Sequence, residues 1–280
     1  MGWYREIGEI VEALDEPSFP ALLAERLRRL VACDLAAMFV YQGRTPPLLV
    51  FDNFKIRGAE QAVANYLNHT YVLNPVYQAH LKGVAPGVYR IRDLAPDAFF
   101  ESEYHRQVEI ILSDQEEIGY ITPEWPRGQE EVDITISVDQ GATCEISLYR
   151  PISDGGFDEA KMARLREVYP VLAACFRDHW RRHGAAYGCR SGGRDVWADD
   201  VLDQFGAAVL TNRERQVIQL VLRGHSSQSI GDLLEISMTT VKTHRKHAYE
   251  KLGISTQAEL LSSFLGFVRS EPGFARVGAE

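Results

Sequence analysis

A run of closely spaced helix-start signals near the C-terminus constrains the fold of this chain more than any other feature. Four side chains that can accept a hydrogen bond from a free backbone N–H precede segments with periodic apolar residues: Thr211, Ser226 (or Ser227), Ser237 and Thr256. Glu214 and Glu259 each follow a threonine by three residues, which completes two capping boxes. Gly224 and Gly253 are placed to end two of the segments. The sequence therefore predicts four short helices within residues 211–265.

The four predicted helices have apolar residues at helical spacing, which indicates that they pack around one small core. These residues are Val217, Ile218, Val221, Leu222, Ile230, Leu233, Val241, Ala248, Leu252, Leu260, Leu261, Phe264 and Leu265. The turn between the second and third helices is short, at Glu235–Ser237, and Gly231 permits a close approach of the two helices. Such a short connection is typical of a helix-turn-helix pair.

The third predicted helix places basic and hydroxyl side chains together in its first half. Lys242, Thr243, Arg245 and Lys246 crowd one side of this helix, away from its apolar positions. In a helix-turn-helix pair, the first half of the second helix enters the DNA major groove, where Lys can donate to guanine and a Thr methyl can contact thymine. A solvated basic face is the alternative, but the capped helices at the correct spacing favour DNA binding.

Residues throughout this segment match the sequence pattern of a known family of DNA-binding domains: Leu210, Thr211, Arg213, Glu214, Val217, Gly224, Ser226, Ile230, Leu234, Ser237, Thr240, Val241, Lys242, His244, Lys251, Leu252 and Gly253. With these residues, which include the TVKxH and KLG segments, residues 207–270 resemble the LuxR-type (GerE-like) DNA-binding domain. Ser227, Ser229 and Gly231 depart from the residues that the family often has there. The resemblance implies a transcriptional regulator that binds double-stranded DNA.

The resemblance also implies roles for individual residues. The base-reading positions would be Lys242, Thr243 and Lys246. The positions nearer the phosphates would be Thr239, Thr240, His244 and Arg245. The last helix would pair two subunits on DNA, so the resemblance implies a homodimer.

The distribution of charge agrees with a DNA-binding C-terminus. The formal net charge of the whole chain is −9. Residues 207–270 nevertheless carry a net charge of +3, whereas residues 1–206 carry −11. This asymmetry predicts that phosphate contacts are confined to the C-terminal module.

Composition predicts the domain boundaries. Glycine, alanine and serine replace periodic apolar positions at residues 183–194, which is typical of a linker. We therefore predict four regions: a ligand-sensing and dimerisation domain at residues 1–183, a linker at 184–206, the helix-turn-helix domain at 207–270 and a tail at 271–280. The predicted fold class is α+β.

The predicted N-terminal domain mixes both kinds of secondary structure. The predicted helices are Trp3–Leu14, Phe19–Val31, Glu60–His69, Phe99–Leu112 and Phe157–Trp180. The predicted strands are Leu35–Tyr41, Leu48–Phe51, Val88–Ile91, Glu117–Thr122 and a hairpin of Val132–Val138 with Cys144–Tyr149. This antiparallel sheet flanked by helices resembles GAF-like sensor domains.

The last of these helices carries a single apolar stripe: Met162, Leu165, Tyr169, Leu172, Phe176 and Trp180. The stripe can pack on the sheet, or part of it can pair with a second subunit. Both interpretations fit the spacing.

The N-terminal domain determines which signal, phosphorylation or a bound ligand, controls this protein. It opens with helices, and Asn53–Lys55 after Asp52 does not resemble the loop of a phosphorylated receiver. Asn74 and Gln61 stand where acyl-homoserine lactone receptors have their ligand-binding Asp and Trp. We therefore predict a sensor of another small molecule. There are two alternatives. One is a lactone receptor, and the other is a constitutive DNA-binding protein whose N-terminal domain docks a partner protein.

Aromatic residues concentrate in the middle of the N-terminal domain. The candidate ligand-pocket residues are Tyr66, Tyr71, Asn74, Tyr77, Tyr89, Phe99, Tyr104 and Tyr120. Aromatic walls with few polar groups suit a small ligand. The alternative is that these residues form ordinary core.

Other functions lack support in the sequence. No GxSxG, HExxH or P-loop motif occurs, and we expect the adjacent acids Glu130 and Glu131 to be solvated rather than catalytic. The cysteines lack metal-ligand spacing, so we expect Cys33, Cys144 and Cys175 to be buried thiols and Cys189 to be exposed. No cofactor or metal site is predicted. Without an apolar run long enough to span a membrane, the chain is expected to be a cytoplasmic protein and not an enzyme.

Overall fold

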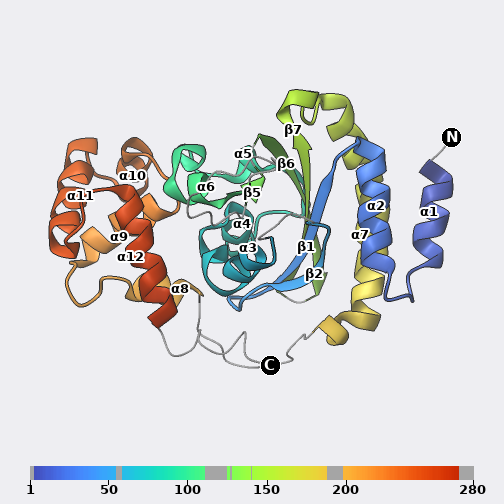
Figure 1. Ribbon diagram of the computed structural model, residues 1–280, viewed down its shortest axis with the longest axis horizontal. Helices are drawn as coiled ribbons and strands as arrows, with labels where there is room; N and C mark the ends of the chain where they lie inside the picture. Colours follow the sequence, from blue (N-terminus) through green and yellow to red (C-terminus); the bar gives the residue numbers. More distant parts are fainter. Residues whose placement is uncertain are drawn as a thin grey trace. The chain divides into compact units, whose positions relative to one another are not determined.

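The structure is a computed structural model that describes residues 3–54, 59–110, 125–126, 128–139, 141–187 and 198–270 (Figure 1). The chain divides into two compact units, each built from separate stretches of sequence. The first unit comprises Met1–Arg57, Ala79–Leu94 and Pro126–Asp195. The second unit comprises Gly58–Gln78, Ala95–Trp125 and Val196–Glu280.

A five-stranded antiparallel sheet of order β2-β1-β7-β6-β3 forms the centre of the first unit. Its strands are β1 (Leu35–Gln42), β2 (Leu48–Asp52), β3 (Gly87–Arg90), β6 (Gln129–Asp139) and β7 (Ala142–Pro151). The helices of this unit are α1 (Trp3–Glu12), α2 (Phe19–Val31), α5 (Ile91–Leu94), η4 (Ile152–Asp154), α7 (Glu159–His183) and η5 (Gly184–Tyr187). The predicted antiparallel sheet with flanking helices is therefore confirmed.

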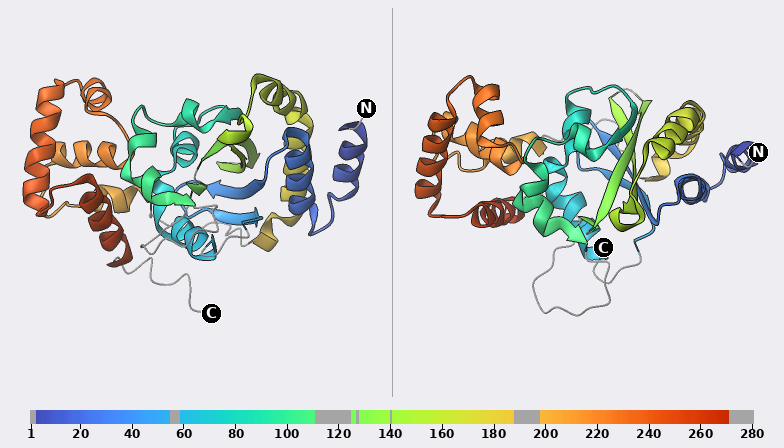
Figure 2. Two further views of the ribbon diagram at one scale, coloured as in Figure 1. Left: turned by 45° about the horizontal axis from the view of Figure 1, so that its top comes forward. Right: turned by 90° about the horizontal axis from the view of Figure 1, so that it is seen from above.

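One face of the sheet is covered by α2 and α7, and α1 lies outside them (Figures 1 and 2). The buried residues Val132, Ile134 and Ile136 of β6 belong to the same core as Leu165 and Leu172 of α7. The apolar stripe of α7 therefore packs on the sheet, as the first of the two interpretations predicts. Because side chains alternate along a strand, the odd-numbered residues of β6 face the other side of the sheet.

The hairpin of β6 and β7 sets the register of the central strands. Ile134 lies opposite Ile146, and Glu131 lies opposite Tyr149. Gly141 in the connecting turn has a φ of 72°, a left-handed conformation that favours glycine. The predicted hairpin is therefore confirmed.

The described residues between β2 and β6 include several short helices: α3 (Ala59–Asn65), the π-helix η1 (Tyr66–Thr70), η2 (Tyr71–Leu73), α4 (Pro75–Leu81), η3 (Phe99–Glu101) and α6 (Glu103–Val108). The short strands β4 (Glu109–Ile110) and β5 (Trp125–Pro126) pair with each other. The prediction of one continuous helix over Phe99–Leu112 is wrong, because Ser102 is extended with a ψ of 153° and the chain enters β4 after Val108. The strand predicted at Glu117–Thr122 lies outside the described residues.

The C-terminal helices of the second unit are α8 (Ala198–Gln204), α9 (Asn212–Leu222), α10 (Ser227–Leu234), α11 (Met238–Leu252) and α12 (Gln257–Ser270). The four helices predicted from the caps are α9 to α12. The additional helix α8 joins their core, because the Phe205 ring that follows it lies 5.5 Å from the ring of Phe264. Among the described residues, no helix is long and apolar enough to cross a membrane.

Candidate nucleic-acid interface

Side-chain caps begin the helices of the DNA-binding candidate. The Thr211 hydroxyl accepts from the N–H of Glu214 at 3.3 Å, and the Glu214 carboxylate accepts from the N–H of Thr211 at 2.8 Å. Ser226 and Ser237 cap α10 and α11 in the same way, at 3.1 Å and 3.0 Å. Since each cap satisfies N–H groups that lack a partner within the helix, the three helices start at fixed positions.

An ion pair between an exposed lysine and a buried glutamate joins α9 to α11. The Lys251 ammonium donates to both carboxylate oxygens of Glu214, at 2.9 Å and 2.7 Å. Glu214 is 4% exposed, and it also holds the capping contact with Thr211. The hydrogen bond from Lys251 is the main cause that lowers the pKa of Glu214 to about 2. One carboxylate therefore fixes both the start of α9 and the end of α11.

The turn between α10 and α11 is tight, as its length predicts. Glu235 ends α10 in a left-handed conformation with a φ of 55°. The N–H of Ile236 donates to the carbonyl of Gly231 at 2.9 Å. A Cβ atom on Gly231 would lie 2.8 Å from the carbonyl oxygen of Ile236, so glycine permits the close approach expected from the sequence.

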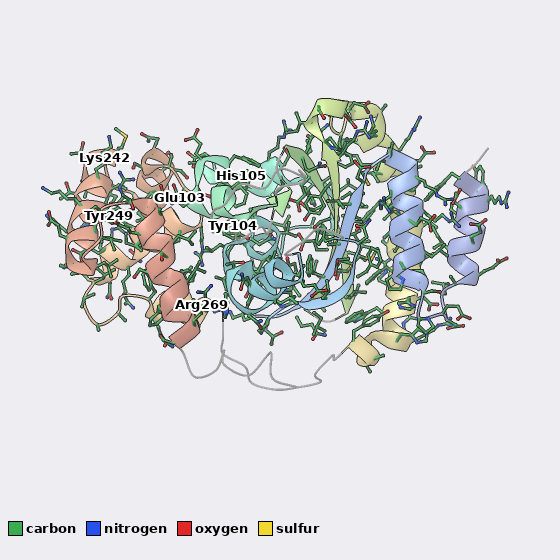
Figure 3. The ribbon with its side chains drawn as sticks, in the orientation of Figure 1. Glu103, Tyr104, His105, Lys242, Tyr249 and Arg269 are labelled. Atoms are coloured by element: carbon green, nitrogen blue, oxygen red, sulfur yellow. The ribbon has the colours of Figure 1, made fainter. Side chains whose placement is uncertain are left out.

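The proposed base-reading residues lie in the exposed first half of α11. Lys242, Thr243 and Lys246 are exposed, while Val241 on the same helix is fully buried (Figure 3 marks Lys242). The Thr243 hydroxyl donates to the carbonyl of Thr239 at 3.0 Å, which leaves the threonine methyl to make other contacts. The Lys246 ammonium lies 3.8 Å from Glu250, a loose and exposed pair that DNA could displace.

The residues assigned to phosphate contacts surround this face. Thr239 is exposed, and Thr240, His244 and Arg245 are partly exposed. The hydroxyl oxygens of Thr240 and Ser237 lie 2.8 Å apart at the start of α11. Backbone N–H groups and the positive end of the dipole also favour a phosphate at this helix start.

Asn74, a pocket candidate, has a structural role at the start of α4. Its side-chain oxygen accepts from the N–H groups of Val76 and Tyr77, at 2.6 Å and 3.4 Å. Its amide donates to the hydroxyl of Tyr66 at 3.0 Å. These contacts cap a helix that opens with Pro75, so Asn74 is occupied within the protein.

The other pocket candidates fall into separate groups. Tyr71 and Tyr77 are fully buried and meet edge to face, with their ring centres 5.1 Å apart. Phe99 and Tyr104 form another buried pair, at 5.9 Å. Tyr89 belongs to the first compact unit, where its hydroxyl donates to the carbonyl of Ala85. Tyr120 lies outside the described residues.

Phe99 also lies against the helix-turn-helix segment within the second unit. The N–H of Ala98 donates to the carbonyl of Gly224 at 3.0 Å, and the N–H of Ser226 donates to Asp97 at 2.9 Å. A Cβ atom on Gly224 would lie 2.7 Å from the Cα atom of Phe99. The segment before η3 thus contacts the turn between α9 and α10.

Sequence reasoning missed three buried carboxylates on the polar face of the sheet. Glu131, Asp133 and Glu145 are 2%, 0% and 1% exposed. The expectation that Glu130 and Glu131 are solvated is wrong: Glu131 is buried, and Glu130 forms ion pairs with Arg90 and Arg92. The sequence feature that could have indicated these buried carboxylates is the alternation of acidic with apolar residues in β6. The same alternation is typical of a strand with one side facing solvent, so it does not by itself predict burial.

The described cysteines behave as predicted. Cys33, Cys144 and Cys175 are buried free thiols, and Cys189 lies outside the described residues. Burial raises the pKa of Cys33 to about 12 and raises the pKa values of Cys144 and Cys175 as well. Because the thiolate is the reactive form, these residues are inert components of the core.

Comparison with known proteins identifies the helix-turn-helix segment. Residues 208–264 match the family described as bacterial regulatory proteins, luxR family (GerE). The HTH-type transcriptional regulator MalT of Yersinia enterocolitica is 40% identical over 65 residues, which are 21% of this chain and 7% of MalT. The resemblance noted from the sequence is therefore confirmed for this segment.

Longer matches extend into the N-terminal part of the chain. A protein of Aeromonas salmonicida described as an HTH-type transcriptional regulator in the exeN 3' region is 28% identical over 204 residues, or 71% of this chain and 96% of that protein. The structure of the VqsR LBD domain from Pseudomonas aeruginosa matches with a TM-score of 0.52 and 19% identity, covering 65% of this chain and 98% of that one. This second likeness is one of fold alone.

Replacing Lys251 by Met should destabilise the helix-turn-helix segment. The variant keeps the aliphatic stem but leaves Glu214 without its ammonium partner. Lys251 is 40% exposed, so solvent screens the pair, and we expect the free energy of unfolding to fall by about 1 kcal/mol. Urea denaturation of the full chain, followed by circular dichroism, measures this change. Lys246→Met is the matched control, and equal stability of the two variants would contradict the role of the pair.

The same pair should make stability depend on pH in the acid range. Because the pKa of Glu214 is lowered from 4.5 to about 2 in the folded state, its contribution is complete above pH 4.5 and is lost as the pH falls toward 2. The stability difference between wild type and Lys251→Met should therefore shrink over this interval. Urea denaturation at a series of pH values tests this expectation, and a constant difference would argue against it.

Proposed function

We propose that this chain, whose residues 208–264 match the luxR family of bacterial regulatory proteins, regulates transcription as a homodimer that binds operator DNA under the control of a small molecule. The observation that carries the proposal is the exposed first half of α11, held in a frame of three capped helices. This helix has the donors and the methyl group that base recognition needs.

The side chains of α11 divide the work of DNA binding. Lys242, Thr243 and Lys246 read base edges in the major groove, the two lysines donating to guanine O6 and N7. Thr239, Thr240, His244 and Arg245 contact the phosphates and fix the register of the helix on the duplex. The net charge of +3 over residues 207–270 attracts DNA to this end of the chain, and the acidic remainder keeps the rest of the protein away.

The N-terminal domain senses a small molecule other than an acyl-homoserine lactone. The fold likeness to a structure named an LBD domain supports a sensor role. Asn74 stands where lactone receptors have an Asp, and its oxygen already accepts from two backbone N–H groups. That oxygen is therefore engaged in capping α4 and is not available to hold the amide of a lactone.

Effector binding changes DNA affinity by shifting the equilibrium between two conformations of the protein that place the DNA-binding helices differently. The hydrogen bonds of Asp97 and Ala98 with the turn between α9 and α10 offer one physical route, because they join a sensor segment directly to the start of α10.

The last helix, α12, is the surface through which two subunits pair on DNA. The protein acts in the cytoplasm, where its DNA target lies, and it is not an enzyme.

Replacing Lys242 or Lys246 by Ala should weaken binding to the specific operator by about 1 to 3 kcal/mol, if each lysine makes a good base contact. The operator is first selected from a random duplex pool with the wild-type protein, and affinity is then measured by fluorescence anisotropy. Lys82→Ala is the control, because Lys82 is exposed and lies outside the DNA-binding segment. Unchanged affinity and an unchanged footprint in both α11 variants would remove these lysines from base reading.

Control by a small molecule is tested on the same operator. Isothermal titration of the full chain against a metabolite panel should find a compound that binds and also changes operator affinity. The double variant Lys242→Ala, Lys246→Ala should bind this compound with the wild-type Kd, because the effector site is separate from α11. If no compound both binds and alters operator affinity, small-molecule control is wrong.

A further inference from the structure

Three acidic side chains gather on the face of the sheet opposite α7. Glu131 and Asp133 are alternate residues of β6, and Glu145 is on the neighbouring strand β7. Asp133 lies opposite Ser147, and Glu145 lies opposite Thr135, so the strand register places all three acids on the same face. Oxygen atoms of the three carboxyl groups lie within 4.8 Å of one another.

These carboxyl groups are buried without enough hydrogen-bond donors. Among the described residues, neither oxygen of Asp133 has a hydrogen-bond partner of ordinary geometry, although this side chain is 0% exposed. The Ser147 hydroxyl and the Glu131 carboxyl group lie close enough to lower the pKa of Asp133 against the rise caused by burial. One oxygen of Glu131 and Oε1 of Glu145 also lack a partner there. Buried polar groups are almost always satisfied in proteins, so unsatisfied oxygens on all three of these neighbouring carboxyl groups indicate a missing donor.

Burial and mutual repulsion make the ionised form of the cluster unfavourable. Burial raises the pKa of Asp133 to about 7, and it raises the pKa values of Glu131 and Glu145 well above their ordinary range. Repulsion by Asp133 adds to the rise for both glutamates. A positive charge at the centre of the cluster would remove both penalties.

We propose that Glu131, Asp133 and Glu145 bind the primary ammonium group of an amine effector. This inference rests on the proposed function, because it names the chemical class of the small molecule that the N-terminal domain senses. A primary ammonium has three N–H donors, and the three carboxylates supply one acceptor for each. Acceptors about 2.8 Å from a tetrahedral nitrogen lie about 4.6 Å apart, which agrees with the observed spacing.

Hydroxyl groups of neighbouring side chains hydrogen-bond to the carboxylates and favour their ionised form. The Tyr41 hydroxyl donates to Oε2 of Glu145, which leaves Oε1 for the ligand. The hydroxyls of Ser147 and Tyr149 lower the pKa values of Glu145 and Glu131, respectively, through hydrogen bonds to these groups. The hydroxyl groups of Tyr41 and Tyr149 thus lie at the cluster and hold two of its carboxyl groups in place.

A divalent metal ion fits the same residues less well. Calcium takes six to eight oxygen ligands, often including backbone carbonyls, and magnesium requires an octahedral set. On a sheet face the carbonyls of β6 and β7 are paired in the ladder, so these strands offer the three carboxylates and hydroxyl groups, such as that of Ser147, that already hydrogen-bond to them. Three acceptors leave a metal ion half coordinated, whereas they satisfy every donor of a primary ammonium.

The proposal is tested by binding measurements on the full chain in an amine-free buffer. The probes are butylamine, putrescine and spermidine, with butanol and tetramethylammonium as controls that lack a charged N–H donor. Primary amines should raise the melting temperature and bind in isothermal titration, and both controls should have no effect. Stabilisation by calcium, magnesium or manganese chloride without stabilisation by any amine would overturn the proposal. Absence of stabilisation by every amine would also overturn it.

Asp133→Asn separates ligand binding from a purely structural role. This variant should lose amine affinity at least about tenfold, because one buried acceptor becomes an amide. Without amine, it should melt at a higher temperature than wild type above pH 7, since the unpaired buried carboxylate is gone. The control Glu12→Gln alters an exposed acid and should change neither value. Unchanged amine affinity in Asp133→Asn would contradict the proposal.

Amine binding and control of DNA binding by a small molecule can be tested separately. If a neutral compound binds both wild type and Asp133→Asn and changes operator affinity in both, small-molecule control stands and the amine assignment is wrong. If amines bind wild type through the carboxylates but operator affinity never changes, the amine site stands and its role in regulation is wrong.

Discussion

The alternation of side chains along β6 and β7 is the constraint on which the first unit depends. One face of these strands is apolar and shares a core with α2 and α7, and the other face holds three buried carboxylates. A slip of one residue in the register would exchange the two faces and would press Asp133 against α7. The pairing of Ile134 with Ile146 therefore fixes both the core and the chemistry of the opposite face.

The DNA-binding part of the chain depends on local signals instead. Each cap links residues that are three apart, as between Thr211 and Glu214. Such signals can be recognised in the sequence, and once the helices are placed, the helical period alone puts Lys242 and Lys246 on an exposed side. This is why the sequence predicted the four helices and the three-residue turn. The Lys251 to Glu214 pair adds a long-range link that spacing could not reveal.

The carboxylate face could not be predicted in the same way. Glu131 and Glu145 meet only through the hairpin register, and polar residues that alternate along a strand are also typical of a face in contact with water. The aromatic residues were a weaker guide for a related reason. Tyr71 and Tyr89 are the same residue type and lie near each other in the sequence, but they belong to different compact units. The extended conformation of Ser102, which ends the predicted helix early, likewise had no strong local signal.

The proposed amine site on the sheet and the proposed base-reading helix α11 must be coupled if the amine controls DNA binding, and thermodynamic linkage tests this coupling most directly. If amine binding changes operator affinity by some factor, operator binding must change amine affinity by the same factor. The decisive measurement is the Kd of the best-binding amine probe with and without saturating operator DNA. We predict that the two Kd values differ, and that the ratio equals the change in operator affinity caused by the amine. Identical Kd values would contradict the account.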